Sequence, residues 1–315
     1  MSRAVIFALA GGVLSAVLYA SALVGAAGSL LLMFLVQLPL FLCGLSREQG
    51  WIGAALAGAV GTCAMALTGG TWAACNYALA EALPAAILSQ RAGLHRQRAD
   101  GQIEWYPAGA FLFWLSLYAA AVLLGFMLYY LPAQGGLEGE LQRGMAALFA
   151  GMRVSVSPDA KALIDAFVGI MPGLGGATWL LITAGNASLA QALLQRFGHN
   201  LRPSPELSSL SLPAALALGV AGSAALGLLA SGGLGFAGRN LSFVLAVPYF
   251  FAGLACIHGL MRRRQAGVRS FLLLYGALAI AVVALSWLVI MAIAGLGLID
   301  QVAGLRRRLG PPDGR

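Results

Sequence analysis

The chain has 315 residues, of which 60% are hydrophobic and 10% are charged, and its formal net charge is +8. Soluble globular domains carry about 25% charged residues, so this composition excludes a soluble fold with a hydrated surface. The positive charge does not indicate nucleic-acid binding, because the arginines lie in short clusters between apolar segments and no basic patch is interleaved with aromatic residues.

Apolar runs near 20 residues recur along the chain, and each is long enough to cross a hydrocarbon core of about 30 Å. They predict an all-α, polytopic integral membrane protein with nine or ten membrane helices in one membrane-embedded domain, residues 1–304. The expected segments are 3–21, 28–45, 51–69, 72–90, 108–131, 162–195, 209–232, 237–260 and 269–304.

The first segment begins like a signal peptide, with Arg3 before an apolar stretch and a cleavage-like motif at 20–22. We expect an uncleaved helix instead, because Gly12, Ala16 and Ala20 form a small-xxx-small row, which is typical of closely packed membrane helices. Cleavage is the alternative.

Further small-residue rows follow in later segments. They are Gly53, Ala57 and Gly61, and then Gly219, Ser223 and Gly227. Such rows indicate either tight helix contacts within one chain or exposed faces that dock a partner membrane protein. Gly12, Ala16, Ala20, Gly53, Ala57 and Gly61 are the partner-docking candidates.

The fourth segment carries an ionisable acid, Glu81, within NYALAEALPAAILSQR (76–91). If this segment begins near Trp72, Glu81 lies about 13 Å into the helix, near the bilayer midplane. An acid at that depth costs at least about 2.5–3.5 kcal/mol unless it faces protein or water. We therefore expect Glu81 either to face protein or water, or to be protonated.

Other groups near Glu81 predict a polar site. Tyr77 is one turn away and is placed to donate a hydrogen bond, and Asn76 precedes it. Pro84 has no N–H, so the carbonyl of Ala80 is expected to lack its helical partner. These features are typical of a substrate or proton path in a membrane protein. The alternative is a structural hydrogen bond from Glu81 to a neighbouring helix.

Residues 132–161 form the one long loop expected outside. Leu137, Leu141, Leu148 and Met152 share a helical face there, which predicts either a short interfacial helix or an ordinary surface helix. Ser157, followed by Pro158 and Asp159, predicts the start of the next helix.

The sixth segment contains lesser site candidates, Asp165, Pro172 and Asn186. Pro172 is followed by glycines at 173, 175 and 176, so we expect the helix to break between Met171 and Gly176. Arg239 and Asn240 open the eighth segment, where a helix-capping or interfacial role is expected.

Basic loops set the orientation. With a cytoplasmic N-terminus, the basic loops 91–107, 196–208 and 262–269 share the cytoplasmic side. The segment from Ser270 to Gly304 is too long for one crossing, so we expect a split near Ala284 that also brings the C-terminus to the cytoplasm. A tilted single helix with an outside tail is the alternative. The basic tail, 305–315, is expected to be disordered.

Motifs for catalysis are absent from the sequence. It contains no GxxxxGK[ST] loop and no HExxH, and the four cysteines and three histidines share no metal-binding spacing. We therefore expect no enzyme activity, no metal and no cofactor.

Two stretches, NLSFVLAVPYFFAGLACIHGLMRRR from Asn240 and GLGLIDQVAGLRRR near the end, resemble the YybS-like bacterial membrane proteins (domain of unknown function DUF2232). LPAALALGV fits the middle of that family. The first half, in LPLFLCGLSREQGWIGAALAGAVG and EALPAAILS, is more weakly similar to the substrate-binding S subunits of energy-coupling-factor transporters. That similarity covers residues within 1–131 and implies a helical solute-binding protein driven by a separate ATPase module.

Together these features predict a multi-pass protein of the bacterial inner membrane. Its expected function is to bind or transport a small solute with a partner membrane protein or ATPase module. The solute would lie between the fourth and sixth segments. The alternative is a non-catalytic scaffold for cell-envelope assembly.

Overall fold

The structure is a computed structural model that describes residues 2–24, 28–153, 156–207, 210–265, 267–285 and 287–308. Contacts divide the chain into two compact units. The first contains Met1–Phe111 and Leu181–Pro205, and the second contains Leu112–Leu180 and Glu206–Arg315. Each unit therefore draws on chain segments that are far apart in the sequence.

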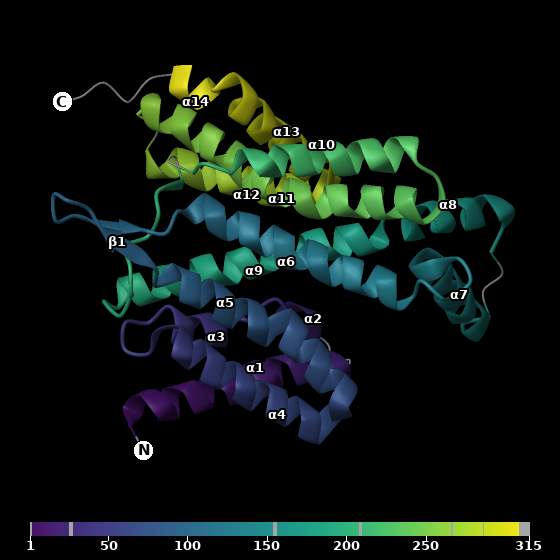
Figure 1. The fold of residues 1–315 in the computed structure, drawn as a ribbon, viewed down its shortest axis with the longest axis horizontal. Helices are drawn as coiled ribbons and strands as arrows, with labels where there is room; N and C mark the ends of the chain where they lie inside the picture. The colour runs from purple at the N-terminus through teal and green to yellow at the C-terminus, as the bar shows by residue number, and fades with distance from the viewer. Residues whose placement is uncertain are drawn as a thin grey trace. The chain divides into compact units, whose positions relative to one another are not determined.

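The first unit consists of helices and one small hairpin (Figure 1). Its elements are α1 (Arg3–Val24), α2 (Ser29–Met33), α3 (Leu38–Gly44), α4 (Gly50–Tyr77), the π-helical turn η1 (Ala78–Ala82), α5 (Leu83–Ala92), β1 (His95–Gln97), β2 (Ile103–Trp105), the start of α6 (Ala108–Tyr129) and the end of α9 (Met171–Arg196). Helices α1, α3 and α4 pack against one another.

The expected single helix over 28–45 is wrong, because the structure has two short helices, α2 and α3, joined by the turn 34–37. Pro39 occupies the first turn of α3. Proline lacks an N–H and disfavours helical geometry in the preceding residue. A helix therefore begins readily at this position but does not continue through it.

Helix α4, η1 and α5 together run from Gly50 to Ala92, which is 43 residues. Gly70 interrupts this run with φ 76° and ψ −176°, a backbone conformation far from helical. The interruption separates the expected segments 51–69 and 72–90, so the boundary predicted between them is confirmed.

A β-hairpin occupies the loop 91–107, which the sequence predicted only as a basic loop. Strands β1 and β2 are antiparallel, with Arg96 opposite Glu104. The two side chains form an ion pair with 2.7 Å between Nε and Oε2. The signal for this hairpin is weak, since each strand has only three residues.

Three loops meet at one end of the first unit. Backbone hydrogen bonds join Arg47 to His199 and Leu201 to Leu45, and Arg202 bonds to Tyr106 beside the hairpin. The loops after α3, α5 and α9 therefore share one end of this unit. That arrangement agrees with the prediction that 91–107 and 196–208 lie on the same side of the membrane.

The second unit is also helical. Its elements are the remainder of α6, then α7 (Gly136–Gly151), α8 (Pro158–Val168), the start of α9, α10 (Ala214–Leu229), α11 (Gly232–Arg263), α12 (Val268–Leu285), α13 (Trp287–Ala303) and α14 (Leu305–Arg308). The predicted helix in the outer loop is confirmed as α7, and it has no fully buried residue. Its interfacial position stays a prediction.

The predicted start of α8 is confirmed, since the Ser157 side chain accepts a hydrogen bond from the Ala160 N–H and Pro158 is the first helical residue.

The break expected between Met171 and Gly176 lies earlier in the chain. The chain turns at Gly169 and Ile170, and α9 then continues unbroken from Met171 through Gly176. Pro172 fits the first turn of a helix, where its missing N–H removes no bond.

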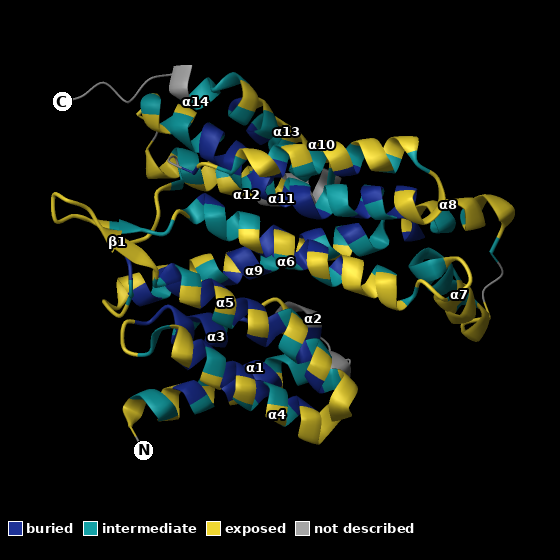
Figure 2. Ribbon diagram, in the orientation of Figure 1, coloured by how far each residue is buried: buried dark blue, intermediate teal, exposed yellow. Residues whose placement is uncertain are grey.

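Helix α11 packs closely against α10 and α13. A Cβ atom at Gly227 would lie 2.7 Å from the Arg239 nitrogen, and one at Gly297 would lie 2.7 Å from the nitrogen of Gly253. The row 219–227 therefore packs within the chain, on α11. Figure 2 shows buried and exposed residues alternating around the helices, as expected when each helix packs on one side only.

The split expected near Ala284 is close to the observed helix ends, because α12 ends at Leu285 and α13 begins at Trp287.

The expected disorder of 305–315 is wrong for 305–308, which form α14. Arg306 there pairs with the buried Asp300, with 2.6 Å between Nε and Oδ2. The remaining tail, 309–315, lies outside the described residues.

Among the described residues, five helical stretches are long and apolar enough to cross a membrane. They are Arg3–Ser21, Gly50–Ala92, Ala108–Tyr129, Met171–Arg196 and Gly232–Arg263. Shorter apolar helices cover Ala214–Leu229, Val268–Leu278 and Trp287–Ala303. The prediction of an all-α polytopic membrane protein is confirmed.

Candidate functional site

Glu81 is a buried acid on an irregular helical turn. Its side chain is 7% exposed, and it lies on η1, where the Leu83 N–H bonds to the carbonyl of Ala78, five residues earlier. Pro84, which is also buried, cannot donate the next helical bond to Ala80. A π-helical turn absorbs this missing bond, and such turns are frequent at functional sites.

Gln37 occupies the position facing this turn. Its Nε2 donates to the carbonyl of Ala80 at 2.9 Å, so the turn 34–37 bonds to the carbonyl to which Pro84 cannot donate. The same amide lies close to the Glu81 carboxyl. Gln37 Oε1 is buried with no hydrogen-bond partner.

Tyr77 is fully buried, and it does not bond to Glu81 as expected. Its hydroxyl donates to Ser15 Oγ at 2.7 Å, and Ser15 Oγ donates to the Val36 carbonyl at 2.7 Å. The hydroxyl fits closely over Gly61, where a Cβ atom would collide with it. Helix α1 therefore supplies a nearer acceptor for Tyr77 than η1 does.

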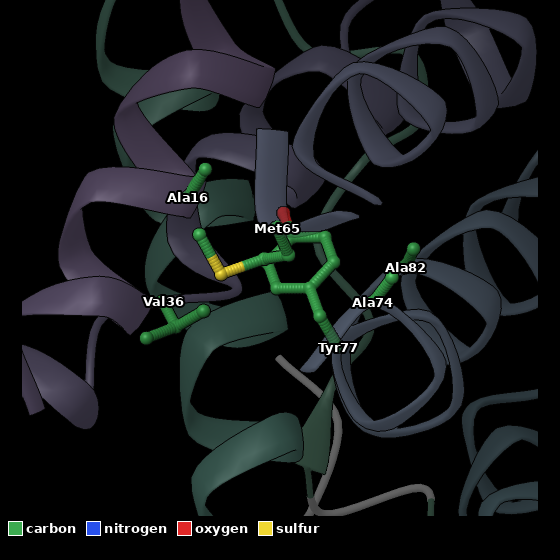
Figure 3. Close-up of a cluster of buried hydrophobic side chains, with 6 residues drawn as sticks. All are labelled: Ala16, Val36, Met65, Ala74, Tyr77 and Ala82. Atoms are coloured by element: carbon green, nitrogen blue, oxygen red, sulfur yellow. The ribbon is translucent and has the colours of Figure 1, made fainter. Parts of the chain in front are cut away.

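Figure 3 shows the apolar cluster that holds the Tyr77 ring. Met65 lies against the ring, and side chains from α1, the turn 34–37 and η1 complete the cluster, which consists of Ala16, Val36, Met65, Ala74, Tyr77 and Ala82. Tyr19 adds an edge-to-face contact with a ring-centroid distance of 5.4 Å. This packing fixes the helix immediately before Glu81.

Asn186, on the part of α9 that belongs to the first unit, bonds to the same turn. Its Nδ2 donates to the Phe34 carbonyl at 2.7 Å and to the Ile182 carbonyl at 2.9 Å. Its Oδ1 is buried without a partner. Polar side chains from α1 and α9 thus hold the break between α2 and α3, and Gln37 links that break to η1.

The other site candidates do not join this group. The Asn76 amide donates to Trp72 on its own helix. Asp165 forms an ion pair with Lys161 at 2.5 Å in the second unit. Pro172 begins α9 in that unit. Of the predicted site residues, the structure therefore brings together Glu81, Tyr77, Pro84 and Asn186 around the turn 34–37.

The partner-docking candidates lie inside the first unit. Gly12 and Ala16 on α1 face α4, and a Cβ atom at Gly12 would collide with Ala57 and Val60. Ala57 is fully buried, and Gly53 and Gly61 are also buried, while Ala20 packs against the apolar cluster that contains Tyr77. These rows support the alternative of tight contact within the chain.

Metal-binding residues do not gather in the part of the chain that the structure describes, where no group of three or more His, Cys, Asp or Glu is found. All four cysteines are free. The absence of a metal or cofactor stays a prediction.

Gln37 and Ser15 were not among the site residues predicted from the sequence. Gln37 is the only polar residue in LLLMFLVQLPLFL (30–42), two positions before a proline, and that pairing is the signal that could have found it. Ser15 carries no such signal, because a serine in a membrane helix commonly bonds to its own backbone.

Comparison with known proteins gives a family for the chain. A family model described as "Predicted membrane protein (DUF2232)" matches residues 13–301. The chain belongs to this family. No curated protein and no solved structure matches it. The DUF2232 match includes Gln37, Glu81 and Asn186 and confirms the YybS-like resemblance. The weaker similarity to energy-coupling-factor S subunits stays a prediction.

Proposed function

We propose that this DUF2232 protein is a component of the bacterial inner membrane that binds a small solute for transport, and that Glu81 lies on the solute or proton path. The observation that carries this proposal is a buried carboxyl with no ion-pair partner among the described residues. Ionisable residues inside membrane helices most often mark substrate or proton pathways.

The surroundings of Glu81 support the same function. Solute sites in secondary transporters are commonly built where membrane helices are discontinuous. Here the acid sits on a π-helical turn and faces the break between α2 and α3. Gln37 Oε1 and Asn186 Oδ1 are unpaired near that break. These two buried oxygens can therefore accept hydrogen bonds from a bound solute.

A scaffold in cell-envelope assembly is the second candidate. The observation that favours it is the tight burial of Glu81, which suits a structural acid. A scaffold would use the small-residue rows of α1 and α4 as docking faces, but those rows pack inside the first unit. We therefore favour the solute-binding function.

A partner or a proton gradient would supply the energy for transport. The sequence has no P-loop motif, so ATP hydrolysis would require a separate ATPase module. Purification in mild detergent, followed by identification of co-purifying proteins, tests this point. An ATPase pair supports transport, whereas cell-wall machinery supports the scaffold.

Substitution of Glu81 tests the site directly. Glu81→Gln keeps the side-chain shape and removes the charge, so we expect the protein to fold and insert normally but to lose function. Glu81→Leu should favour membrane insertion by about 3 kcal/mol. The measurements are thermal melting in detergent and growth complementation of a deletion strain.

Glu140→Gln is the matched control, because Glu140 is a partly exposed acid paired with Arg143, and its loss should leave complementation intact. The opposite pattern is a Glu81→Gln variant that complements fully and a Glu81→Leu variant that melts early. That pattern would show that Glu81 is only a structural acid, since leucine leaves the Gln37 amide without its polar neighbour at a cost of about 1–3 kcal/mol.

A further inference from the structure

Arg202 is a buried cation in the loop after α9, at the end of the first unit where three loops meet. Arg202 is only 8% exposed. One guanidinium nitrogen, Nη1, donates to the Tyr106 carbonyl at 3.0 Å. Its position next to the hairpin makes it part of the end predicted to face the cytoplasm.

Aromatic rings flank the guanidinium. Its central carbon lies 5.7 Å from the ring centre of Trp105 and 5.6 Å from that of Phe111. Cation–π contacts at these distances are favourable, but they do not neutralise the charge. Both rings are only partly buried.

Arg202 has no counter-charge among the described residues. No carboxylate forms an ion pair with it, and its Nε is buried without a hydrogen-bond partner. Arg306, by contrast, pairs with Asp300 at 2.6 Å. Burial lowers the pKa of Arg202, yet an arginine does not release its proton in proteins. Within the described residues the guanidinium is met only by a backbone carbonyl and two aromatic rings, so an anion bound here would be stabilised by the buried charge.

The donors of the guanidinium indicate which anion would suit this position. Nη1 is bonded to Tyr106, whereas the buried Nε has no hydrogen-bond partner. The Nε edge of a planar guanidinium presents two parallel donors, and this geometry matches a phosphate. Trp105 and Tyr106 are the residue types that gather at the headgroup level of membranes. Basic pockets at the cytoplasmic side of membrane helices bind anionic lipid headgroups.

We propose that the Arg202 guanidinium binds the phosphate of an anionic phospholipid headgroup, held beside Trp105 and Phe111 at the inner end of the first unit. This site is separate from Glu81 and does not depend on the function proposed for it. A free phosphate would share the same chemistry, so the experiment must distinguish the two sources.

Thermal melting of the delipidated full-length protein in a neutral detergent tests the ligand. Phosphatidylglycerol is expected to raise the melting temperature, while phosphatidylcholine and inorganic phosphate at the same concentration are not. Stabilisation by inorganic phosphate without any by phosphatidylglycerol would overturn the lipid source. An equal effect of phosphatidylcholine would overturn the requirement for an anion.

Variants test the residue. In Arg202→Gln the stabilisation by phosphatidylglycerol should disappear, and native mass spectrometry should find less retained lipid. The matched control is Arg98→Gln, because Arg98 is an exposed arginine of the same hairpin, and it should keep the wild-type response. If both variants lost the same amount of stabilisation by phosphatidylglycerol, the lipid would be attracted by the basic surface as a whole. That result would contradict a site at Arg202.

A second variant keeps the test valid if Arg202→Gln fails to fold. Arg202→Lys retains the positive charge and the long stem but removes Nε and the planar fork. We expect the phosphatidylglycerol concentration at half-maximal stabilisation to rise several-fold. An unchanged value would exclude the bidentate phosphate contact.

Discussion

Buried amide side chains complete the backbone at the helix breaks of this protein. Gln37 bonds to the Ala80 carbonyl at η1. Asn240 does the same in the second unit, where Oδ1 accepts from the Gly173 N–H at 2.6 Å and Nδ2 donates to the Gly169 carbonyl at 2.9 Å. The first residues of a helix have N–H groups with no partner inside the helix. Asn240 therefore caps α9 from a different helix.

The close approach of α9 to Asn240 depends on Gly173, because a Cβ atom there would lie 2.7 Å from the Asn240 carbonyl oxygen. The role expected for Asn240 was a cap or an interfacial contact at the start of its own segment. The structure places Asn240 inside α11. The predicted capping role is therefore correct, but Asn240 caps α9 and not its own helix.

Replacement of Asn240 by leucine should destabilise the second unit. The change leaves the Gly173 N–H and the Gly169 carbonyl buried without partners, and each such group costs about 1–3 kcal/mol. We expect a clearly lower melting temperature in detergent. The control is Asn76→Leu, because that amide bonds only to its own partly exposed helix. Equal melting of Asn240→Leu and wild type would contradict the capping role.

At the scale of whole elements, prolines and glycines decide where the helices begin and end. Pro39 and Pro172 each occupy the first turn of a helix, and the breaks precede them. Pro84 instead follows a π-helical turn within a continuous run. The same residue type thus occurs both at helix starts and beside an irregular turn.

Gly70 separates two helical segments within Gly50–Ala92. A helix of 43 residues would be about 64 Å long, roughly twice the hydrocarbon thickness. The backbone at Gly70, with φ 76° and ψ −176°, is accessible to glycine and strained for other residues. This single residue divides a run that is too long for one crossing.

Replacement of Gly70 by alanine should therefore destabilise the protein. We expect a loss of about 1–3 kcal/mol, seen as a lower melting temperature in detergent. Gly125→Ala is the control, since Gly125 lies inside α6 with open space around the position of a Cβ atom, and alanine there should be neutral or slightly stabilising. A Gly70→Ala variant as stable as this control would contradict the strain argument.

At the scale of the whole molecule, the orientation in the membrane rests on basic loops and on the number of crossings. The loops after α3 and α9 are joined by backbone bonds, and the Arg202 side chain bonds the loop after α9 to the loop after α5. Two of these three loops are basic. Near the C-terminus, α12 and α13 are separate helices of 18 and 17 residues. Each is close to the length of one short crossing.

We expect both termini to be cytoplasmic. A fluorescent protein fused after Arg308 should fluoresce, and alkaline phosphatase at the same position should be inactive, because the arginines at 306–308 resist transfer across the membrane. Phosphatase inserted at Asp100 in the hairpin should also be inactive, whereas an insertion in α7 should be active. An active phosphatase after Arg308 would contradict the split between α12 and α13 as two crossings.

The sequence alone determined the class of this protein. Composition and apolar runs are properties of short stretches, and they established an all-α membrane protein with most helix positions. Local chemistry also predicted the start of α8 at Ser157 and the boundary near Gly70. Each of these depends on residues close together in the chain, which is why the sequence was sufficient.

Only the tertiary structure decided which groups meet. Glu81 and Gln37 are far apart in sequence, and so are Asn240 and Gly173, so no local pattern pairs them. The Tyr77 hydroxyl had acceptors available on more than one helix, and packing on α1 selected Ser15. The small-residue rows fit both an internal contact and a docking face, and the approach of α1 to α4 decided between them. A buried polar group takes the nearest partner in space, and spatial distance is set by the packing of the whole unit.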